Sequence, residues 1–361
     1  MKRTTFLFCL VIYLMTQPLR AAVVEDLFSV ELPVADQTTA QRLSVFNQAF
    51  RHVIVKLTGS QTVLEQPSLK RPLNNSARYV RQFRYFQREL EATDEMLETS
   101  RLMLKVTFNQ EALEDLLREN GIAIWGKQRP NTLLLISYDV NKNISLISSD
   151  TNDDMVGLLD DLANQLGLPV LYPLLDLEDR MQLGVKDVLD LNEQSIETLA
   201  ARYAPDAVLI GNIAGRSGKG WEGRWQIRTS TQIANWSHQA RGRDEIMHRL
   251  MARLAQTLAG EYALDAYVDA EEDILFTVDG VFQVQDHIKV QSYLQSLDAV
   301  ELSRPVQFTK DKVVYRVTLH SSSDDLTRLI GLGNVLELVE LPQIDVASET
   351  QTVNMHYRFI Q

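Results

Sequence analysis

The chain has 361 residues, 45% of them apolar and 23% charged, and its formal net charge is −12 at pH 7. This composition is typical of a folded globular protein and excludes a disordered chain, a collagen and a multi-span membrane protein. A pI near 5.1 argues against general nucleic-acid binding, because phosphate neutralisation needs a basic surface. At roughly 100 to 200 residues per domain, the length predicts two or three domains.

The first 22 residues have the pattern of a secretory signal peptide. Lys2 and Arg3 come first, residues 6–15 form an uninterrupted apolar run, and the segment ends on small residues at Ala22. The run is about half the length that a membrane-spanning helix needs, roughly 20 residues. We therefore predict a cleavable signal over 1–22 and a periplasmic location, with an uncleaved anchor as the alternative.

Cys9 is the single cysteine of the chain and lies inside this apolar run. The exported chain would then contain no cysteine, which excludes disulfides, thiol catalysis and thiolate metal sites. After removal of the signal we expect no transmembrane segment.

The hydrophobic periodicity of residues 23–129 predicts a first domain of β-α-β-β-α order. Its helix has an apolar side chain every three or four residues and ends at a glycine, as expected for a left-handed cap. The expected elements are a strand at 28–34, a helix from 40 to Gly59, strands at 79–86 and 102–108, and a helix after Asn109 that ends at Gly121.

Residues 130–265 predict an α/β sandwich of β-α-β-α-β-β-β-α order, or close to it. The continuous apolar run at 133–136 indicates a strand covered on both faces. The other expected elements are a helix at 155–166, a short strand at 168–172, a helix after Asn192, strands at 206–210, 221–228 and 232–240, and a long helix from Asp244.

Residues 270–361 predict a ferredoxin-like β-α-β-β-α-β module with one extra strand. The fold class is therefore α/β and α+β, with three small mixed modules. The expected elements are a strand at 274–278, a helix at 286–297, two strands around the turn 309–312, a helix capped by Ser323, and strands at 335–338 and 353–359.

Metal and catalytic motifs are missing from the sequence pattern. The six histidines show neither H-x-H nor H-E-x-x-H spacing, and no serine lies in a G-x-S-x-G elbow. Four polar residues have a calcium-loop spacing, but Met155 stands where that loop needs glycine, so we interpret them as a solvated helix start. These four are Asp150, Asn152, Asp154 and Asp161. We predict no catalytic, cofactor-binding or metal-binding residue.

Two cationic segments are candidates for partner binding. The glycine-rich stretch 215–220 departs from the Walker pattern, so we interpret it as a hairpin tip that exposes Arg216 and Lys219 to an anionic partner. Residues 78–88 mix cations with aromatics, which we interpret as a strand with one aromatic and one cationic face. Its candidate residues are Arg78, Arg81, Arg84 and Arg88.

Two resemblances add to this interpretation. The segments 29–37, 48–50 and 55–59 resemble a family of exported gammaproteobacterial proteins whose domain has no assigned function. The segment 200–211, with the hairpin and helix after it, resembles the small α/β domain of several envelope proteins. These are the Tol-system propeller protein, the curli-secretion lipoprotein, activators of penicillin-binding proteins and a flagellar outer-ring protein. Such relatives imply protein binding in the periplasm, although fold alone does not fix activity.

We therefore expect a non-enzymatic periplasmic adaptor or assembly factor of the cell envelope, with envelope proteins as partners, no nucleic acid and no cofactor. The alternative is a hydrolase or ligand-binding protein that acts on a cell-wall or lipid component in a cleft between domains. Carboxylates or histidines converging there from separate domains with shifted pKa values would favour this alternative. A homo-oligomeric subunit of a ring or fibre is a third reading.

Overall fold

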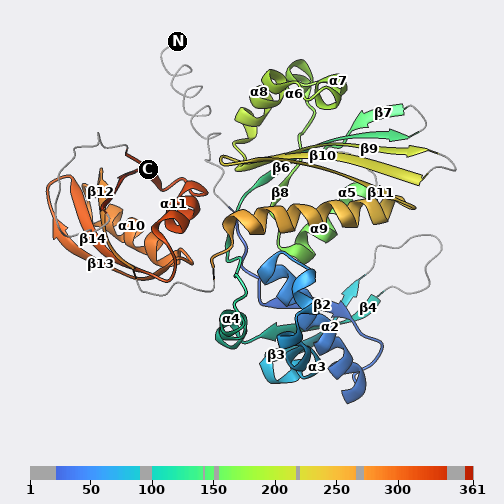
Figure 1. The fold of residues 1–361 in the computed structure, drawn as a ribbon, viewed down its shortest axis with the longest axis horizontal. Coiled ribbons are helices and arrows are strands. Elements are labelled where there is room, and N and C mark those ends of the chain that lie inside the picture. The colour runs from blue at the N-terminus through green and yellow to red at the C-terminus, as the bar shows by residue number, and fades with distance from the viewer. Residues whose placement is uncertain are drawn as a thin grey trace, which may run out of the picture.

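The structure, a computed structural model, describes residues 22–89, 100–140, 143–149, 154–216, 220–265, 272–339 and 354–360. The predicted signal peptide up to residue 21 lies outside these ranges. In the described part the chain forms an α/β fold with three main open sheets, which confirms the predicted fold class (Figure 1). None of the described helices combines the length and the apolarity needed to cross a bilayer.

The first module is a three-stranded antiparallel sheet, in the order β2-β4-β3, covered on one face by a long helix. The structure confirms the predicted helix from residue 40 to Gly59 as α2, and Gly59 forms its left-handed cap with a φ of 64°. The elements are β2 (Ser29–Pro33), α2 (Thr39–Thr58), β3 (Val80–Glu89), β4 (Ser100–Phe108) and α4 (Gln110–Glu119). Four short helical segments between α2 and β3 have no signal in the hydrophobic periodicity of the sequence. They are η1 (Thr62–Glu65), η2 (Pro67–Leu69), α3 (Lys70–Asn74) and η3 (Ser76–Tyr79).

The second module is a mixed sheet in the order β11-β10-β9-β6-β7, with β8 beside β6. It adds β7, α6 and α7 to the predicted order. The elements are β6 (Thr132–Val140), β7 (Asn143–Leu146), α5 (Asp154–Leu166), β8 (Val170–Leu171), α6 (Leu177–Gln182), α7 (Val185–Leu189), α8 (Glu193–Tyr203), β9 (Ala207–Arg216), β10 (Gly220–Arg228), β11 (Ile233–Ala240) and α9 (Arg243–Tyr262).

The third module is a five-stranded sheet in the order β13-β14-β12-β16-β15. The last strand, β16, is the extra one: it inserts parallel to β12, between β12 and β15. The second helix is capped by the Ser322 hydroxyl rather than by Ser323. The elements are β12 (Glu272–Asp279), α10 (Val284–Ser296), β13 (Val300–Phe308), β14 (Lys312–Leu319), α11 (Ser323–Gly331), β15 (Leu336–Leu338) and β16 (Asn354–Phe359).

The modules pack around the long helix α9. In Figure 1, α6, α7 and α8 lie above the second sheet, whereas α5 and α9 lie below it, between that sheet and the first module. A Cβ atom added at Gly59 would lie 2.3 Å from the Cβ of Ala259, so the end of α2 approaches α9 closely. A short sheet pairs β1 (Ala22–Val23), which precedes the first module in the chain, with β5 (Gln128–Arg129), which follows that module. The first and second modules are therefore in direct contact, which sets the geometry of the groove between them.

Candidate binding groove between the first and second modules

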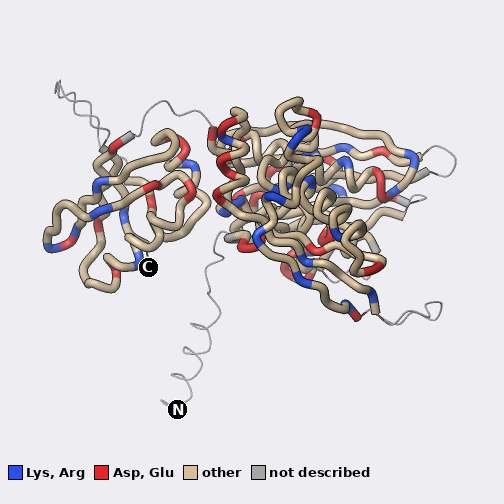
Figure 2. The backbone as a smooth tube through the Cα atoms, turned by 90° about the horizontal axis from the view of Figure 1, so that it is seen from below, with Lys and Arg blue, Asp and Glu red and all other residues tan. Residues whose placement is uncertain are grey.

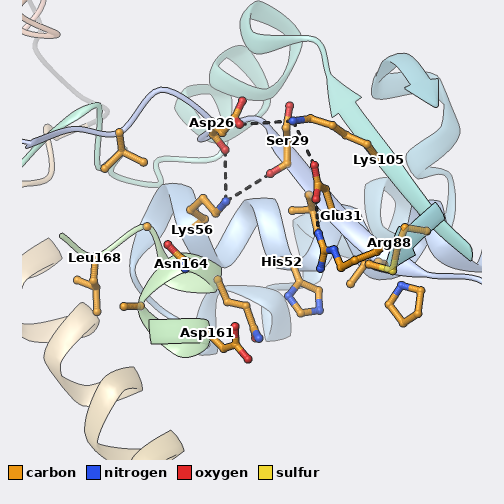
Figure 3. Close-up of a pocket in the computed structure, with 18 of the residues that line it drawn as sticks. Asp26, Ser29, Glu31, His52, Lys56, Arg88, Lys105, Asp161, Asn164 and Leu168 are labelled. Carbon is orange, nitrogen blue, oxygen red and sulfur yellow. Dashed lines mark hydrogen bonds and ion pairs between the residues drawn. The ribbon is translucent and has the colours of Figure 1, made fainter. Parts of the chain in front are cut away.

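A groove of about 960 Å³ lies between the first and second modules. One wall is the edge strand β2, with Lys56 and His52 of α2 beside it. The opposite wall is the end of α5 and the turn after it, which includes Asn164 and Leu168 (Figure 3). The groove has the volume of a ligand pocket and brings together residues more than 100 positions apart in the chain.

Strand β2 presents backbone groups to this groove. Phe108 N–H donates to the Phe28 carbonyl, and Val34 N–H donates to that of Leu102, so even-numbered residues of β2 pair with β4. By the alternation of an antiparallel pair, the backbone groups of the odd-numbered residues Glu31 and Pro33 point away from β4. Because proline has no N–H, the edge offers the N–H and carbonyl of Glu31 and the carbonyl of Pro33.

Lys56 is a buried cation at one end of β2. Its side chain is 7% exposed, and its Nζ donates to the carbonyls of Asp26 and Ser29 at 3.3 Å each (Figure 3). Among the described residues no carboxylate forms an ion pair with it. Burial, together with the nearby charge of Arg129, lowers the pKa of Lys56 to about 8, although the Asp26 carboxylate opposes this shift. Lys56 is thus mostly protonated at pH 7, and Asp26 offsets its charge only from a distance.

Arg129 is a second buried cation and joins the two modules. Its guanidinium is fully buried, packs 4.1 Å from the centre of the Trp125 ring, and donates to five backbone carbonyls. The acceptors are Lys56 at 2.7 Å, Leu166 at 2.8 Å, Gly126 and Trp125 at 2.9 Å, and Gly167 at 3.0 Å. Burial lowers the pKa of Arg129 to about 9. The groove wall therefore rests on two desolvated positive charges.

The sheet face that continues the groove is cationic. Arg88 pairs with Glu31 at 2.5 Å, and Lys105 lies 3.4 Å from a carboxylate oxygen of both Glu31 and Asp26. Arg101 also lines the groove and is exposed. Glu31 and Asp26 therefore offset only part of this charge. In the rest of the described chain, Lys and Arg are interspersed with Asp and Glu (Figure 2).

The predicted residues of strand β3 are only partly brought together. Arg84 and Arg88 lie on one face and flank Phe86, with each guanidinium within 6 Å of that ring. The expected separation into an aromatic face and a cationic face is therefore wrong, because Phe86 shares the face of these two arginines. Arg81 is exposed at a bulge, and Arg78 lies before the strand in η3, over the ring of Tyr79.

The other predicted residues lie either in the second module, away from the groove, or outside the residues that the structure describes. Arg216 ends β9 in the second module, and Lys219 lies outside the described residues, as do Asp150 and Asn152 of the calcium-loop spacing, whereas Asp154 begins α5. In the described ranges no group of His, Asp and Glu side chains is arranged to hold a metal ion. Lys56 was not among the predicted site residues. Its burial could have been predicted, because it follows Val53 by three positions on the apolar stripe of α2.

The alternative of an active site finds limited support in this groove. Burial lowers the pKa of His52 as well as that of Lys56. Asp161 from the second module lines the same groove as Asp26 and Glu31 from the first. However, the two groups with lowered pKa lie on one helix, four residues apart, rather than on separate modules. The arrangement can bind an anion, and it holds no nucleophile activated by an adjacent base among the described side chains that line it.

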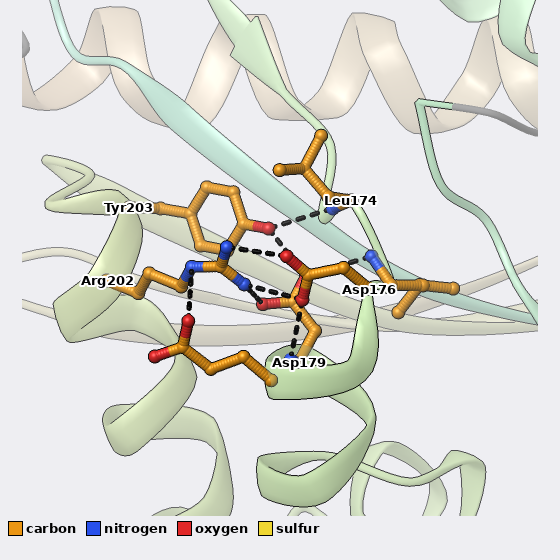
Figure 4. Close-up of polar contacts among 7 residues, drawn as sticks. Leu174, Asp176, Asp179, Arg202 and Tyr203 are labelled. Atoms are coloured by element: carbon orange, nitrogen blue, oxygen red, sulfur yellow. Dashed lines mark hydrogen bonds and ion pairs between the residues drawn. The ribbon is translucent and has the colours of Figure 1, made fainter. Parts of the chain in front are cut away.

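A second polar cluster in the second module has a structural role. The carboxylate of Asp179 is fully buried and accepts from Arg202, from the Tyr203 hydroxyl at 2.6 Å and from the Leu175 N–H at 2.9 Å (Figure 4). Arg202 also pairs with Asp176, which lowers the pKa of that carboxyl. The cluster ties α6 to the end of α8.

Residues 21–126 match a family described as "Domain of unknown function (DUF8605)". The match covers the first module and is consistent with the prediction of an uncharacterised family. No curated protein matches the chain. Among solved structures, a competence-damaged protein (CinA) superfamily protein from Klebsiella pneumoniae 700603 is similar at 13% identity and a TM-score of 0.20, over 42% of this chain and 91% of that one. At this TM-score the similarity carries no argument about function.

Proposed function

We propose that the protein is a non-enzymatic adaptor or assembly factor of the bacterial cell envelope, exported to the periplasm, which works by binding other proteins. The observation that carries the proposal is the groove between the first and second modules, with its cationic wall and free strand edge. An open groove lined by backbone groups and by both exposed and buried charge is suited to a macromolecular segment. The expected membership of an exported gammaproteobacterial family and the expected likeness of the second module to the Tol-propeller domain agree with this role.

The second candidate function is the binding of an anionic cell-wall or lipid component in the same groove. It is favoured by the buried ammonium of Lys56, which has no carboxylate in direct contact among the described residues and would attract a carboxylate or a phosphate of any source. A hydrolase would need more, because a reacting group and a base must lie within hydrogen-bond reach of each other.

In-cell crosslinking of a tagged full-length chain tests the proposal, followed by envelope fractionation and mass spectrometry. The adaptor role predicts one dominant envelope protein, and its loss when Arg84 and Arg88 are both changed to Gln. Arg316→Gln is the matched control, because Arg316 is an exposed strand arginine of the third module. Recovery of free monomer alone from the soluble periplasm would contradict the adaptor role and favour the ligand-binding candidate.

A further inference from the structure

Two buried cations, Lys56 and Arg129, lie beside the groove. The Lys56 carbonyl accepts directly from the guanidinium of Arg129. Backbone carbonyls are the hydrogen-bond partners of both cations. Carbonyl dipoles satisfy the N–H groups but cancel no net charge, and the Asp26 and Asp298 carboxylates act on these cations without a direct ion pair, so the buried charge is only partly compensated. The groove beside Lys56 therefore favours an incoming carboxylate.

The charged surface follows the edge of one strand. The groove runs along the five residues of β2, which at about 3.3 Å per residue is roughly 15 Å of extended chain. Arg88, Lys105 and Arg101 lie on the sheet face beside this edge, and Lys56 lies at one end of it. Side chains of an extended segment alternate between two faces. A segment beside β2 with an acidic residue at every second position would thus place those carboxylates on the face of Arg88, Arg101 and Lys105. Lys56 belongs to the helix that covers the other face, so it would meet a carboxylate at the end of the segment.

Glu31 occupies part of this surface in the free protein. Its carboxylate accepts from Arg88 and lies 3.4 Å from Lys105, while its own backbone N–H and carbonyl point into the groove. An incoming carboxylate would compete with the Glu31 side chain for the same two cations. The backbone groups of Glu31 and Pro33 would meanwhile give a short bridge to the segment.

We propose that the groove between β2 and the end of α5 binds an extended acidic segment of a partner protein, with carboxylates at alternate positions directed to Arg88, Arg101 and Lys105 and a further carboxylate, at the end of the segment, beside Lys56. The inference rests on the proposed adaptor function and names the chemistry of its partner. Solvent-accessible cations such as Arg88, Arg101 and Lys105 are worth a few tenths to one kcal/mol each, so several together are needed for measurable affinity.

The test uses the full exported chain and a fluorescent synthetic peptide of four Glu-Thr repeats, titrated by fluorescence anisotropy at low salt. We expect saturable binding that weakens as salt rises, and no binding of the matching Lys-Thr peptide. The triple variant R88Q/R101Q/K105Q should bind about tenfold more weakly. Arg316→Gln removes the same type of charge outside the groove and should bind like the unchanged chain.

Two single variants separate this site from general attraction. Lys56→Met keeps the buried stem and removes the charge, and it should weaken binding while the fold, checked by circular dichroism, is unchanged. Glu31→Gln removes the competing carboxylate and should tighten binding about twofold. Equal affinity of the triple variant and the Arg316→Gln control would overturn the assignment of the groove.

The outcomes also separate the groove from the proposed function. If a partner is captured in cells but the triple variant captures it equally, the adaptor role stands and the groove assignment is wrong. If the peptide binds through the groove but cells yield no protein partner, the adaptor role fails and the acidic-segment site stands. Binding to phosphatidylglycerol vesicles through the same cations, without peptide binding, would contradict the proposal and indicate a membrane surface instead.

Discussion

The guanidinium of Arg129 donates a 2.7 Å hydrogen bond to the backbone carbonyl of Lys56, and two further bonds to the carbonyls that end α5. One fully buried side chain thus fastens the last turn of α2 to the second module. Because α2 carries Lys56 and α5 carries the opposite wall, this contact sets the width of the groove.

Replacing Arg129 by Met should lower the free energy of unfolding by about 3 kcal/mol, because five buried carbonyls lose their donor. Lysine keeps the charge but cannot reach five acceptors, so Arg129→Lys should also destabilise, by a smaller amount. Urea denaturation followed by tryptophan fluorescence measures both. A change below about 0.5 kcal/mol for Arg129→Met would contradict the role of this contact.

Lys56 predicts an unusual dependence of stability on pH. Its folded-state pKa of about 8 lies below the ordinary value of 10.5, so below pH 8 both the folded and the unfolded chain are protonated. Between pH 8 and 10.5 the folded chain releases the proton first, and the free energy of unfolding rises.

The Lys56→Met variant lacks this contribution and serves as the reference. The stability of the unchanged chain relative to the variant should increase by about 2 kcal/mol between pH 7 and pH 9.5. Parallel urea curves at the two pH values provide the measurement, and a constant difference between the two proteins would show that the Lys56 pKa is not depressed.

Asp298 links the third module to the segment before β6. Its carboxylate accepts from the backbone N–H of Lys127 at 2.6 Å, and burial raises its pKa. Asp298→Ala should speed hydrogen exchange of the Lys127 amide about tenfold, since the acceptor is lost. Asp298→Asn keeps an acceptor oxygen and should leave that amide protected. Equal exchange in all three proteins would contradict this role of the contact.

The stability of the contact between α6 and α8 should depend on Asp179. Asp179→Ala removes the acceptor of Arg202, Tyr203 and the Leu175 N–H, and should cost about 3 kcal/mol of stability. Asp190→Ala is the matched control, because Asp190 is exposed and follows α7. Similar thermal melting of the two variants would show that the cluster contributes little.

The sequence predicted the elements whose signals are local. The α2 stripe with its Gly59 cap, the Asn109 and Asn192 caps, and the turn at 309–312 all depend on neighbours a few residues away, and the structure confirms them. The helices α6 and α7 were missed because five or six residues are too few to show a period.

The candidate site could not be predicted in the same way. The groove depends on how α2 and α5 pack, and Arg129 gains its role from carbonyls at Lys56 and Leu166, 73 and 37 residues away. The insertion of β16 beside β12 is likewise a long-range pairing that no periodicity records. Among the candidate cations whose side chains the structure describes, only Arg88 lines the groove.

The most direct test of the adaptor account is photo-crosslinking in living cells from the groove itself. A photoreactive residue would replace Asn164, which is exposed on α5 and lines the groove, and a control would replace Arg316 in the third module. The account predicts a protein adduct from position 164 only, with the crosslinked peptide mapping by mass spectrometry to an acidic segment of an envelope protein. Equal adducts from both positions, or none from position 164, would contradict it.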